Sequence, residues 1–274
     1  MTETLNDEAV LPGSALDSDR MPGHWLLARL GKRVLRPGGV DTTTRLLQSV
    51  AIGSGDDVLE VAPGLGATTR LLLDAGPASY VGVDRDPDAA DLVASLLDGP
   101  NRRVVNASVT ETGLGDASFD VVFGEAYLTM QPDSLKRRAI GELARVLRPG
   151  GRFALHEVAF APDDIDAASQ KKASGDLTST IKVNVTPMTV AGWEALLGEH
   201  GLVVKERFCV PLHLLEPKRL IADEGVVGAA RFVFNVLRDP KARRRVLAMR
   251  RAMSANAANL QAIGIVAERF EESA

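Results

Sequence analysis

The chain has 274 residues, of which 45% are hydrophobic and 25% charged, and its net charge is −4. These values are typical of a globular protein with one large domain and a full hydrophobic core. They exclude a chain that is basic overall, and only 4% aromatic residues argue against a stacking surface for single-stranded nucleic acid. The single cysteine, Cys209, excludes an internal disulfide framework and a cysteine-based metal cluster.

The first 20 residues are polar and acidic and lack an apolar core. We therefore expect a disordered tail over residues 1–20 rather than a signal peptide, followed by a single domain over residues 21–274. No apolar run reaches the length that spans a membrane. These features predict a cytoplasmic protein without a membrane partner.

Two helices are predicted before the first strand. The first covers residues 25–35 and ends at Pro37-Gly38-Gly39, and Asp41 is the expected N-cap of the second, which runs to Val50. One face of the first helix is apolar, through Leu26, Leu27, Leu30 and Val34. The basic residues lie elsewhere: Arg29, Lys32, Arg33 and Arg36. These helices either expose a solvated basic face or cover a binding site.

The sequence pattern of a polar-ligand site follows. A short apolar strand ends near Glu60, a Gly64-x-Gly66 turn comes next, and a helix begins after it. Glycines let the backbone approach a ligand, and the free N–H groups of a helix N-terminus point toward it. A dinucleotide fingerprint would need a third glycine, but Thr69 stands there. A nucleoside with an amino-acid tail fits better, because acids end both this strand and the next, at Glu60 and Asp84.

This stretch resembles the first motif of class I S-adenosylmethionine-dependent methyltransferases, in particular the small-molecule group that includes the ubiquinone/menaquinone C-methyltransferases. The family pattern acid-x-Gly-x-Gly-x-Gly stands here as Glu60-x-Ala62-x-Gly64-x-Gly66. The Leu-Arg-Pro-Gly-Gly-Arg-Phe run at residues 147–153 resembles another family hallmark. The resemblance implies a doubly wound α/β fold with a mostly parallel, Rossmann-like seven-stranded sheet, whose last strand is antiparallel.

The resemblance also implies S-adenosylmethionine as the cofactor. Asp84 would accept hydrogen bonds from the ribose hydroxyls, and Ser108 stands where the family has an acid that contacts the adenine amino group. The residues expected at the cofactor are Glu60, Ala62, Pro63, Gly64, Leu65, Gly66, Asp84, Arg85, Ala107, Ser108 and Glu125.

Strands and helices alternate along the remaining chain. Asp86-Pro87 is the predicted start of a helix. We expect strands over residues 58–61, 79–83, 103–106, 119–123, 152–157 and 202–208, and helices over residues 68–74, 133–147, 167–173 and 191–200. The final strand is predicted at residues 260–269, beyond a long segment with helical pattern.

Catalytic groups are expected at the carboxyl ends of the central strands, where open α/β sheets bind ligands. Glu125 follows the fourth strand, and His156 and Glu157 close the fifth. His156 is the best candidate base because histidine titrates near neutrality, although a hydrogen-bonded histidine inside the fold is the alternative. Glu125 is the second catalytic candidate. Tyr127 either orients an acceptor or belongs to the core. No spacing of His, Asp or Glu suggests a metal site.

Three helical additions are expected, at residues 21–51, 160–190 and 211–259. In the last, one helix stops before Gly225, a second continues to Leu237, and Asp239-Pro240 begins a third that carries several arginines. The second has an apolar stripe of Val226, Ala230, Val233 and Leu237. We expect the additions to cover the methyl-transfer site and line the acceptor pocket. A homodimer interface is the alternative for residues 211–259. The arginines either are solvated or face a subunit, or they bind an anionic substrate.

The predicted function is S-adenosylmethionine-dependent methylation of a small molecule at O, C or N. One alternative is a non-catalytic protein that binds S-adenosylmethionine or S-adenosylhomocysteine as a regulator. The others are a nicotinamide-dependent oxidoreductase and, with support only from the arginine-rich helix, a nucleic-acid methyltransferase. We expect no nucleic-acid partner.

Overall fold

A seven-stranded sheet forms the centre of the computed structural model, which describes residues 16–270. The strand order is β3-β2-β1-β4-β5-β7-β6, and only β7 runs antiparallel to its two neighbours. This is the predicted doubly wound α/β fold with its antiparallel final strand. The strands are β1 Asp57–Val61, β2 Ser79–Asp84, β3 Arg102–Asn106, β4 Phe119–Glu125, β5 Leu147–Phe160, β6 Leu202–Pro211 and β7 Leu260–Arg269.

The central strands are nearly continuous apolar runs because helices cover both faces of the sheet. On one face, α5 and α7 bury Leu143 and Trp193 against β4, β5 and β7. On the other, α2 and α3 bury Leu46 and Leu72 against the sheet. The helices are α1 Gly23–Arg29, α2 Gly39–Val50, α3 Ala67–Asp74, α4 Pro87–Ala94, α5 Asp133–Val146, α6 Ala167–Ile181, α7 Val190–Gly198, α8 Pro217–Arg238 and α9 Pro240–Ala255.

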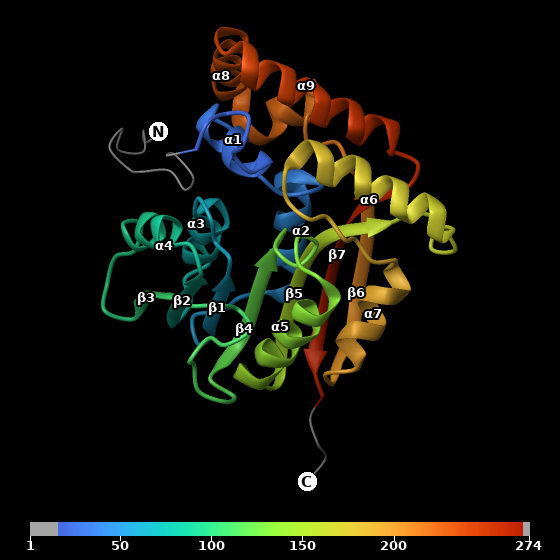
Figure 1. Ribbon diagram of the computed structural model, residues 1–274. Helices are drawn as coiled ribbons and strands as arrows, with labels where there is room; N and C mark the ends of the chain where they lie inside the picture. The colour runs from blue at the N-terminus through green and yellow to red at the C-terminus, as the bar shows by residue number, and fades with distance from the viewer. Residues whose placement is uncertain (1–15, 271–274) are drawn as a thin grey trace.

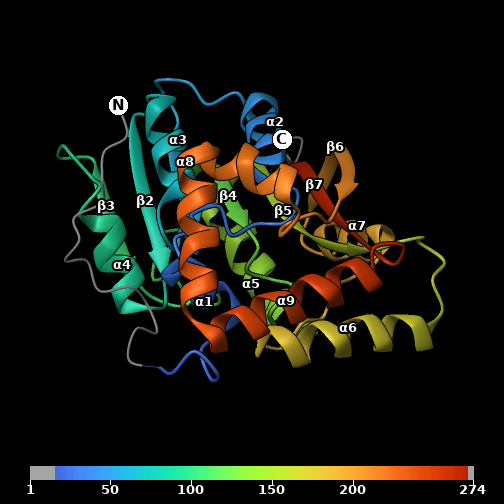
Figure 2. The ribbon, with the colours of Figure 1, turned by 90° about the horizontal axis from the view of Figure 1, so that it is seen from above.

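Four helices from distant parts of the sequence form a separate layer beyond one end of the strands. Figures 1 and 2 show α1, α6, α8 and α9 together in this layer. Its core joins Leu26 of α1, Phe232 of α8 and Met249 of α9, and a second cluster joins Leu177 of α6 to Met253 of α9. All three sequence additions therefore meet in one layer, which we call the helical cover.

The boundaries of the first two helices differ from the prediction. The first helix ends at Arg29 rather than at residue 35, because Gly31 adopts a φ of 103°. The N–H groups of Gly31 and Lys32 bond to the carbonyls of Ala28 and Leu27, which is the glycine-terminated Schellman arrangement. The second helix begins at Gly39, so Asp41 lies in its first turn and is not the N-cap.

Elsewhere the predicted elements are found, several of them longer than expected. Asp86 and Asp239 cap α4 and α9 as predicted. The break expected at Gly225 is a non-helical residue inside α8. The apolar stripe beyond it faces outward, with Val226 72% exposed, and this part of α8 packs inward through Ala229 and Phe232.

The expected tail lies outside the described residues up to residue 15. Within residues 16–20, Ser18 is buried and its hydroxyl donates to Asp239 Oδ2 at 2.9 Å. The buried guanidinium of Arg245 on α9 donates to the carbonyl oxygens of Ser18 and Met21. These contacts attach residues 18–21 to the helical cover.

Candidate functional site

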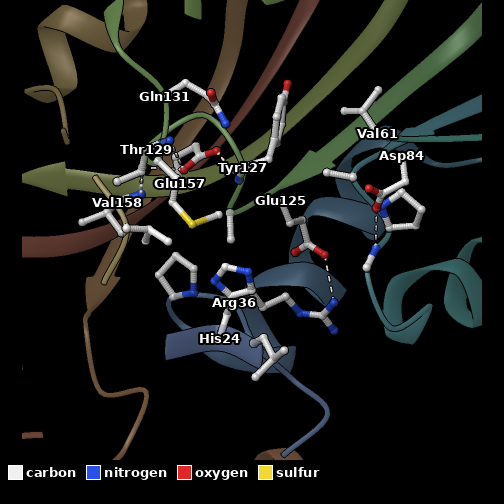
Figure 3. A pocket seen from close by; sticks show the side chains of 18 of the residues that line it. His24, Arg36, Val61, Asp84, Glu125, Tyr127, Thr129, Gln131, Glu157 and Val158 are labelled. Atoms are coloured by element: carbon white, nitrogen blue, oxygen red, sulfur yellow. Dashed lines mark hydrogen bonds and ion pairs between the residues drawn. The ribbon is translucent and has the colours of Figure 1, made fainter. Parts of the chain in front are cut away.

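A cavity of about 500 Å³ lies between the carboxyl ends of the strands and the helical cover. Figure 3 shows side chains converging on it from both sides. One half is formed by the segments that follow β1, β2, β3 and β4, and we call it the strand-end half. Every residue predicted to contact the cofactor lines the cavity except Gly66.

The turn after β1 is shaped by residues with positive φ. Gly64 has a φ of 57°, and a Cβ there would lie 4.0 Å from Cη2 of Trp25. Ala62 adopts a φ of 52° although it carries a Cβ, so it keeps the backbone of the family glycine that it replaces. Gly66 serves packing instead, because a Cβ there would lie 2.4 Å from Leu96 Cδ1.

Two acids stand at the ends of β1 and β2. The buried carboxylate of Asp84 accepts hydrogen bonds from the backbone N–H of Gly64 at 3.2 Å and of Asp86 at 3.0 Å, and burial raises its pKa. Glu60 accepts from Thr69 Oγ1 at 2.6 Å and Tyr80 Oη at 2.5 Å. Complete burial raises the pKa of Glu60 to about 7 against the opposing effect of these two bonds. Thr69, which argued against a dinucleotide site, therefore holds Glu60.

Glu125, at the end of β4, connects this strand to the segment after α1 and to α2 and α3. Its carboxylate accepts hydrogen bonds from Arg36 Nη1 at 2.9 Å and from Thr43 Oγ1 at 2.5 Å. It is also hydrogen-bonded to the hydroxyl of Thr68 and to Nδ1 of His156. Burial alone would raise the pKa of Glu125. The charge of Arg36 and the bonds from His156 and Thr43 outweigh burial and hold the pKa at about 2. Glu125 is therefore a fixed anion and a poor proton acceptor near neutral pH.

His156 lies beneath the site rather than in it. Its side chain is completely buried, Nδ1 is 2.7 Å from Glu125 Oε1, and the residue does not line the cavity. Nε2 has no hydrogen-bond partner within residues 16–270. His156 thus holds Glu125 from behind the cavity lining.

Glu157 fixes the loop that follows β4. Its carboxylate accepts from the backbone N–H groups of Tyr127, Leu128 and Thr129 at 2.6–3.1 Å and from the Thr129 hydroxyl at 2.5 Å. The loop thereby presents Thr129 and Gln131 to the cavity (Figure 3). Tyr127 packs into the main hydrophobic core, although it also borders the cavity.

The other half of the cavity is apolar and is formed by the helical cover, so we call it the cover half. Residues from all three additions contribute to it. They include Leu27, Leu35, Leu177, Ile181, Val183, Val185, Leu212, Leu214, Met249 and Met253.

Two polar side chains in the cover were not predicted as site residues. The imidazole of His24 projects from α1 into the cavity (Figure 3), and its Nδ1 has no partner within the described chain. Burial, followed by the charge of Arg85, lowers the pKa of His24 to about 4. Arg36 is 5% exposed and holds Glu125, whereas the sequence left open a solvated basic face. Both residues stand alone in the sequence, without a motif to mark them.

The comparisons with known proteins agree with this architecture. Residues 58–151 match the family model described as a methyltransferase domain. An uncharacterized protein of Haemophilus influenzae is 34% identical over 220 residues, covering 79% of this chain and 86% of that protein. The demethylmenaquinone methyltransferase of Clavibacter sepedonicus is 33% identical over 124 residues, or 44% of this chain and 47% of that enzyme.

Among solved structures, a phosphoethanolamine N-methyltransferase of Haemonchus contortus in complex with S-adenosyl-L-methionine superposes with a TM-score of 0.69. The match covers 91% of this chain and 57% of that chain at 14% identity, which shows the shared fold. The chain belongs to the class I S-adenosylmethionine-dependent methyltransferases. The cofactor of this methyltransferase is S-adenosylmethionine, which replaces the nicotinamide-dependent alternative.

Two further findings concern metal ligands and membrane-spanning helices. Within residues 16–270, no group of three or more His, Cys, Asp or Glu side chains is arranged to hold a metal ion. None of the helices in this same range is both long and apolar enough to cross a membrane.

Proposed function

We propose that the methyltransferase acts on a small molecule with a largely apolar body. The observation that carries this proposal is that one cavity is lined by both the strand-end half and the cover half. Its volume of about 500 Å³ falls within the range of small-molecule sites, roughly 300–1,000 Å³. The Clavibacter relative is a demethylmenaquinone methyltransferase, which supports an apolar acceptor.

The strand-end half fits the cofactor. Asp84 would accept hydrogen bonds from the ribose hydroxyls, while Gly64 and Leu65 would approach the cofactor through their backbone. Ala107 and Ser108 would border the adenine, and Glu60, Ala62, Pro63 and Arg85 complete the lining. Bound there, S-adenosylmethionine supplies an electrophilic methyl group.

The cover half would hold the acceptor and exclude water from the methyl group. Side chains of α6 and α9 surround an apolar body, and Thr129 and Gln131 offer polar contacts at its edge. A protein that only binds the cofactor would need no such second chamber. This half of the cavity therefore favours an enzyme over a non-catalytic regulator.

We assign the role of proton acceptor to His24 rather than to His156. The neutral imidazole of His24 lines the cavity and has a ring nitrogen without a hydrogen-bond partner among residues 16–270, whereas His156 is sealed behind Glu125. His24 would accept a hydrogen bond from the nucleophilic atom of the acceptor. Because its pKa of about 4 makes it a weak base, it would take the proton only as the methyl bond forms and the acceptor atom becomes strongly acidic. The buried ionic network of Glu125 and Arg36 would keep α2 and the segment after α1 fixed beside it.

The test is methyl transfer into a cell extract from S-adenosylmethionine with an isotopically labelled methyl group. We expect the label in a low-molecular-weight product that partitions into organic solvent. Label found only in protein, in nucleic acid or in water-soluble metabolites would overturn the proposed acceptor class.

A pair of tryptophan substitutions on α9 tests the assignment of the cover half. Met253→Trp places a bulky ring in the cavity. Leu247→Trp places the same ring on the outer face of α9, where Leu247 is 41% exposed. We expect only Met253→Trp to raise KM for the acceptor, with the affinity for S-adenosylhomocysteine unchanged in both. Equal kinetics in the two variants would show that the acceptor does not bind in the cover half.

A further inference from the structure

The outer face of α8 carries an apolar surface that nothing in residues 16–270 covers. Beyond Gly225 the helix exposes large apolar side chains, with Val227 77% and Phe234 56% exposed. At 100° per residue these side chains occupy one continuous arc of about 120° on the helix. The members of this apolar arc are Val226, Val227, Ala230, Val233, Phe234 and Leu237.

Basic side chains lie beside the apolar arc. Residues 217–255 contain ten Lys or Arg and three Asp or Glu, although the whole chain has a net charge of −4. Two of the three acids, Asp223 and Glu224, are buried in ion pairs with Lys32. Arg231 and Arg238 flank the arc on α8. The outer face of α9 adds Arg243, Arg244 and Arg251, and none of these five arginines forms an ion pair within residues 16–270.

The surface lies on the far side of the helical cover from the sheet. Figures 1 and 2 show α8 and α9 at the outside of the molecule, in the layer that closes the cavity. Met249 and Met253, on the inner face of α9, line the cover half of the cavity. The outer surface is therefore separated from the cavity by the thickness of the cover.

We propose that the outer face of α8 and α9 docks onto an anionic lipid bilayer. The apolar arc would enter the boundary between headgroups and acyl chains, and the arginines would contact lipid phosphates. A helix with an exposed apolar arc and a basic flank has the composition of interfacial helices. We expected no membrane partner because the sequence has no membrane-spanning apolar run and no signal-peptide pattern. Neither criterion detects a helix that lies on the membrane surface.

Two other occupants fit only part of this surface. A second copy of the chain could cover the apolar arc, but a two-fold interface would bring the unpaired arginines of both copies together. A nucleic acid could pair with the arginines but would leave the apolar arc facing its phosphates. The bilayer matches both features.

The test measures vesicle binding by the full-length protein, without reference to methyl transfer. In flotation assays we expect binding to vesicles of phosphatidylcholine mixed with phosphatidylglycerol, and at least tenfold weaker binding to phosphatidylcholine alone. The triple variant Val227→Ser, Phe234→Ser, Leu237→Ser and the double variant Arg231→Gln, Arg238→Gln should each lose most of the binding. Val203→Ser, which removes a 47% exposed apolar side chain from β6, is the matched control and should bind normally.

A fluorescence measurement locates the contact. Phe234→Trp should shift its emission to shorter wavelength when anionic vesicles are added, and Val203→Trp should show no shift. Absence of binding by the wild-type protein, or equal binding by the triple variant, would overturn the proposal. It would also be overturned if the triple variant only converts a dimer to a monomer, or if the double variant only loses binding to a DNA duplex.

Discussion

The two halves of the cavity are built on different physical principles. In the strand-end half, each acid has fixed partners: Asp84 holds two backbone N–H groups, Glu60 two hydroxyls, and Glu125 a guanidinium and an imidazole. The cover half is lined mainly by Leu, Val and Met side chains. It also contains the imidazole of His24, whose Nδ1 has no hydrogen-bond partner in the part of the chain that the structure describes.

The difference follows from the two proposed ligands. The strand-end half would hold the cofactor, which is the same in every turnover, and the cover half would hold one particular acceptor. Charged and hydrogen-bonded groups fix the position of a ligand that is always the same. Apolar side chains impose shape and exclude water, and they change with little effect on the sheet beneath them. We therefore expect substitutions in the strand-end half to alter cofactor affinity or stability, and substitutions in the cover half to alter acceptor turnover.

The largest effect is expected from His24. His24→Asn should lower turnover by roughly 10²–10⁴-fold, because the acceptor loses the group that takes its proton. S-adenosylhomocysteine affinity should change little, since the proposed cofactor contacts lie in the other half. Steady-state kinetics and calorimetry on the same preparation measure both quantities.

His156→Asn is the matched comparison for His24→Asn. It removes the partner of Glu125 without touching the cavity lining, so the free energy of unfolding should fall while turnover per folded molecule stays near wild type. Loss of turnover in His156→Asn, with wild-type kinetics in His24→Asn, would reverse the two assignments.

Glu125→Ala tests the link between the halves. Its removal leaves the buried guanidinium of Arg36 without its anion, and uncompensated charges of this kind cost roughly 3–5 kcal/mol. We expect the free energy of unfolding at pH 7, from urea titration, to fall by about that amount. Glu125→Gln keeps hydrogen-bonding atoms near Thr43 and should lose less. Equal and small losses in both variants would mean that Arg36 finds water or another partner.

The residues predicted at the cofactor, except Gly66, line the strand-end half, and the sequence could bring them together because the determinants of this half are local. A strand, a positive-φ turn and an acid at each strand end follow one another within 25 residues of the chain, from residue 60 to residue 84. The sequence also predicted strand β7 correctly at residues 260–269, because its apolar run is long enough to be recognised after the helical segment.

The cover half was less predictable because its determinants are tertiary. His24 acquires its role only when α1 packs against α8 and α9, and Arg36 only when the segment after α1 meets the end of β4. No spacing along the chain marks either residue. Gly31 ends α1 six residues before Pro37-Gly38-Gly39, where the sequence predicts the end of this helix. The stripe of Val226, Val233 and Leu237 has the periodicity of a core face, yet it is exposed, since periodicity shows that a face exists and not what covers it.

The next effect concerns pH and Glu60. Its pKa is about 7 in the folded protein and near 4.5 when unfolded, so its contribution to stability is fully present below pH 4.5 and is lost as pH rises through 7. The loss amounts to about 3 kcal/mol. We expect the wild type minus Glu60→Gln difference in unfolding free energy to fall by that order between pH 4.5 and pH 8. A difference that does not change with pH would mean that Glu60 is ionised over this whole range. Subtracting the variant cancels the titration of groups that both proteins share, such as Glu125 and His24.

Asp84→Asn addresses the cofactor directly. The substitution keeps the size of the side chain but removes the charge that would receive the ribose hydroxyls, a contact worth roughly 1.5–3 kcal/mol. S-adenosylhomocysteine should bind about tenfold or more weakly in calorimetry. Asp91→Asn, on the exposed face of α4, is the control. Unchanged affinity in Asp84→Asn would remove Asp84 from the proposed cofactor site.

The smallest effect is expected at Ala62, where the family pattern has glycine. A left-handed backbone costs an alanine roughly 1–2 kcal/mol, and glycine removes this cost while adding about 0.4–1 kcal/mol of unfolded-state entropy. Ala62→Gly should therefore raise the free energy of unfolding by about 1 kcal/mol or less. Ala51→Gly is the matched control, because Ala51 has a φ of 46° at the exposed end of α2, far from the cavity lining. If Ala51→Gly stabilises the protein and Ala62→Gly destabilises it, the Ala62 methyl group contributes packing against the main core. In that case the strand-end half also contains a residue that is particular to this protein. Specific features would then not be confined to the cover half.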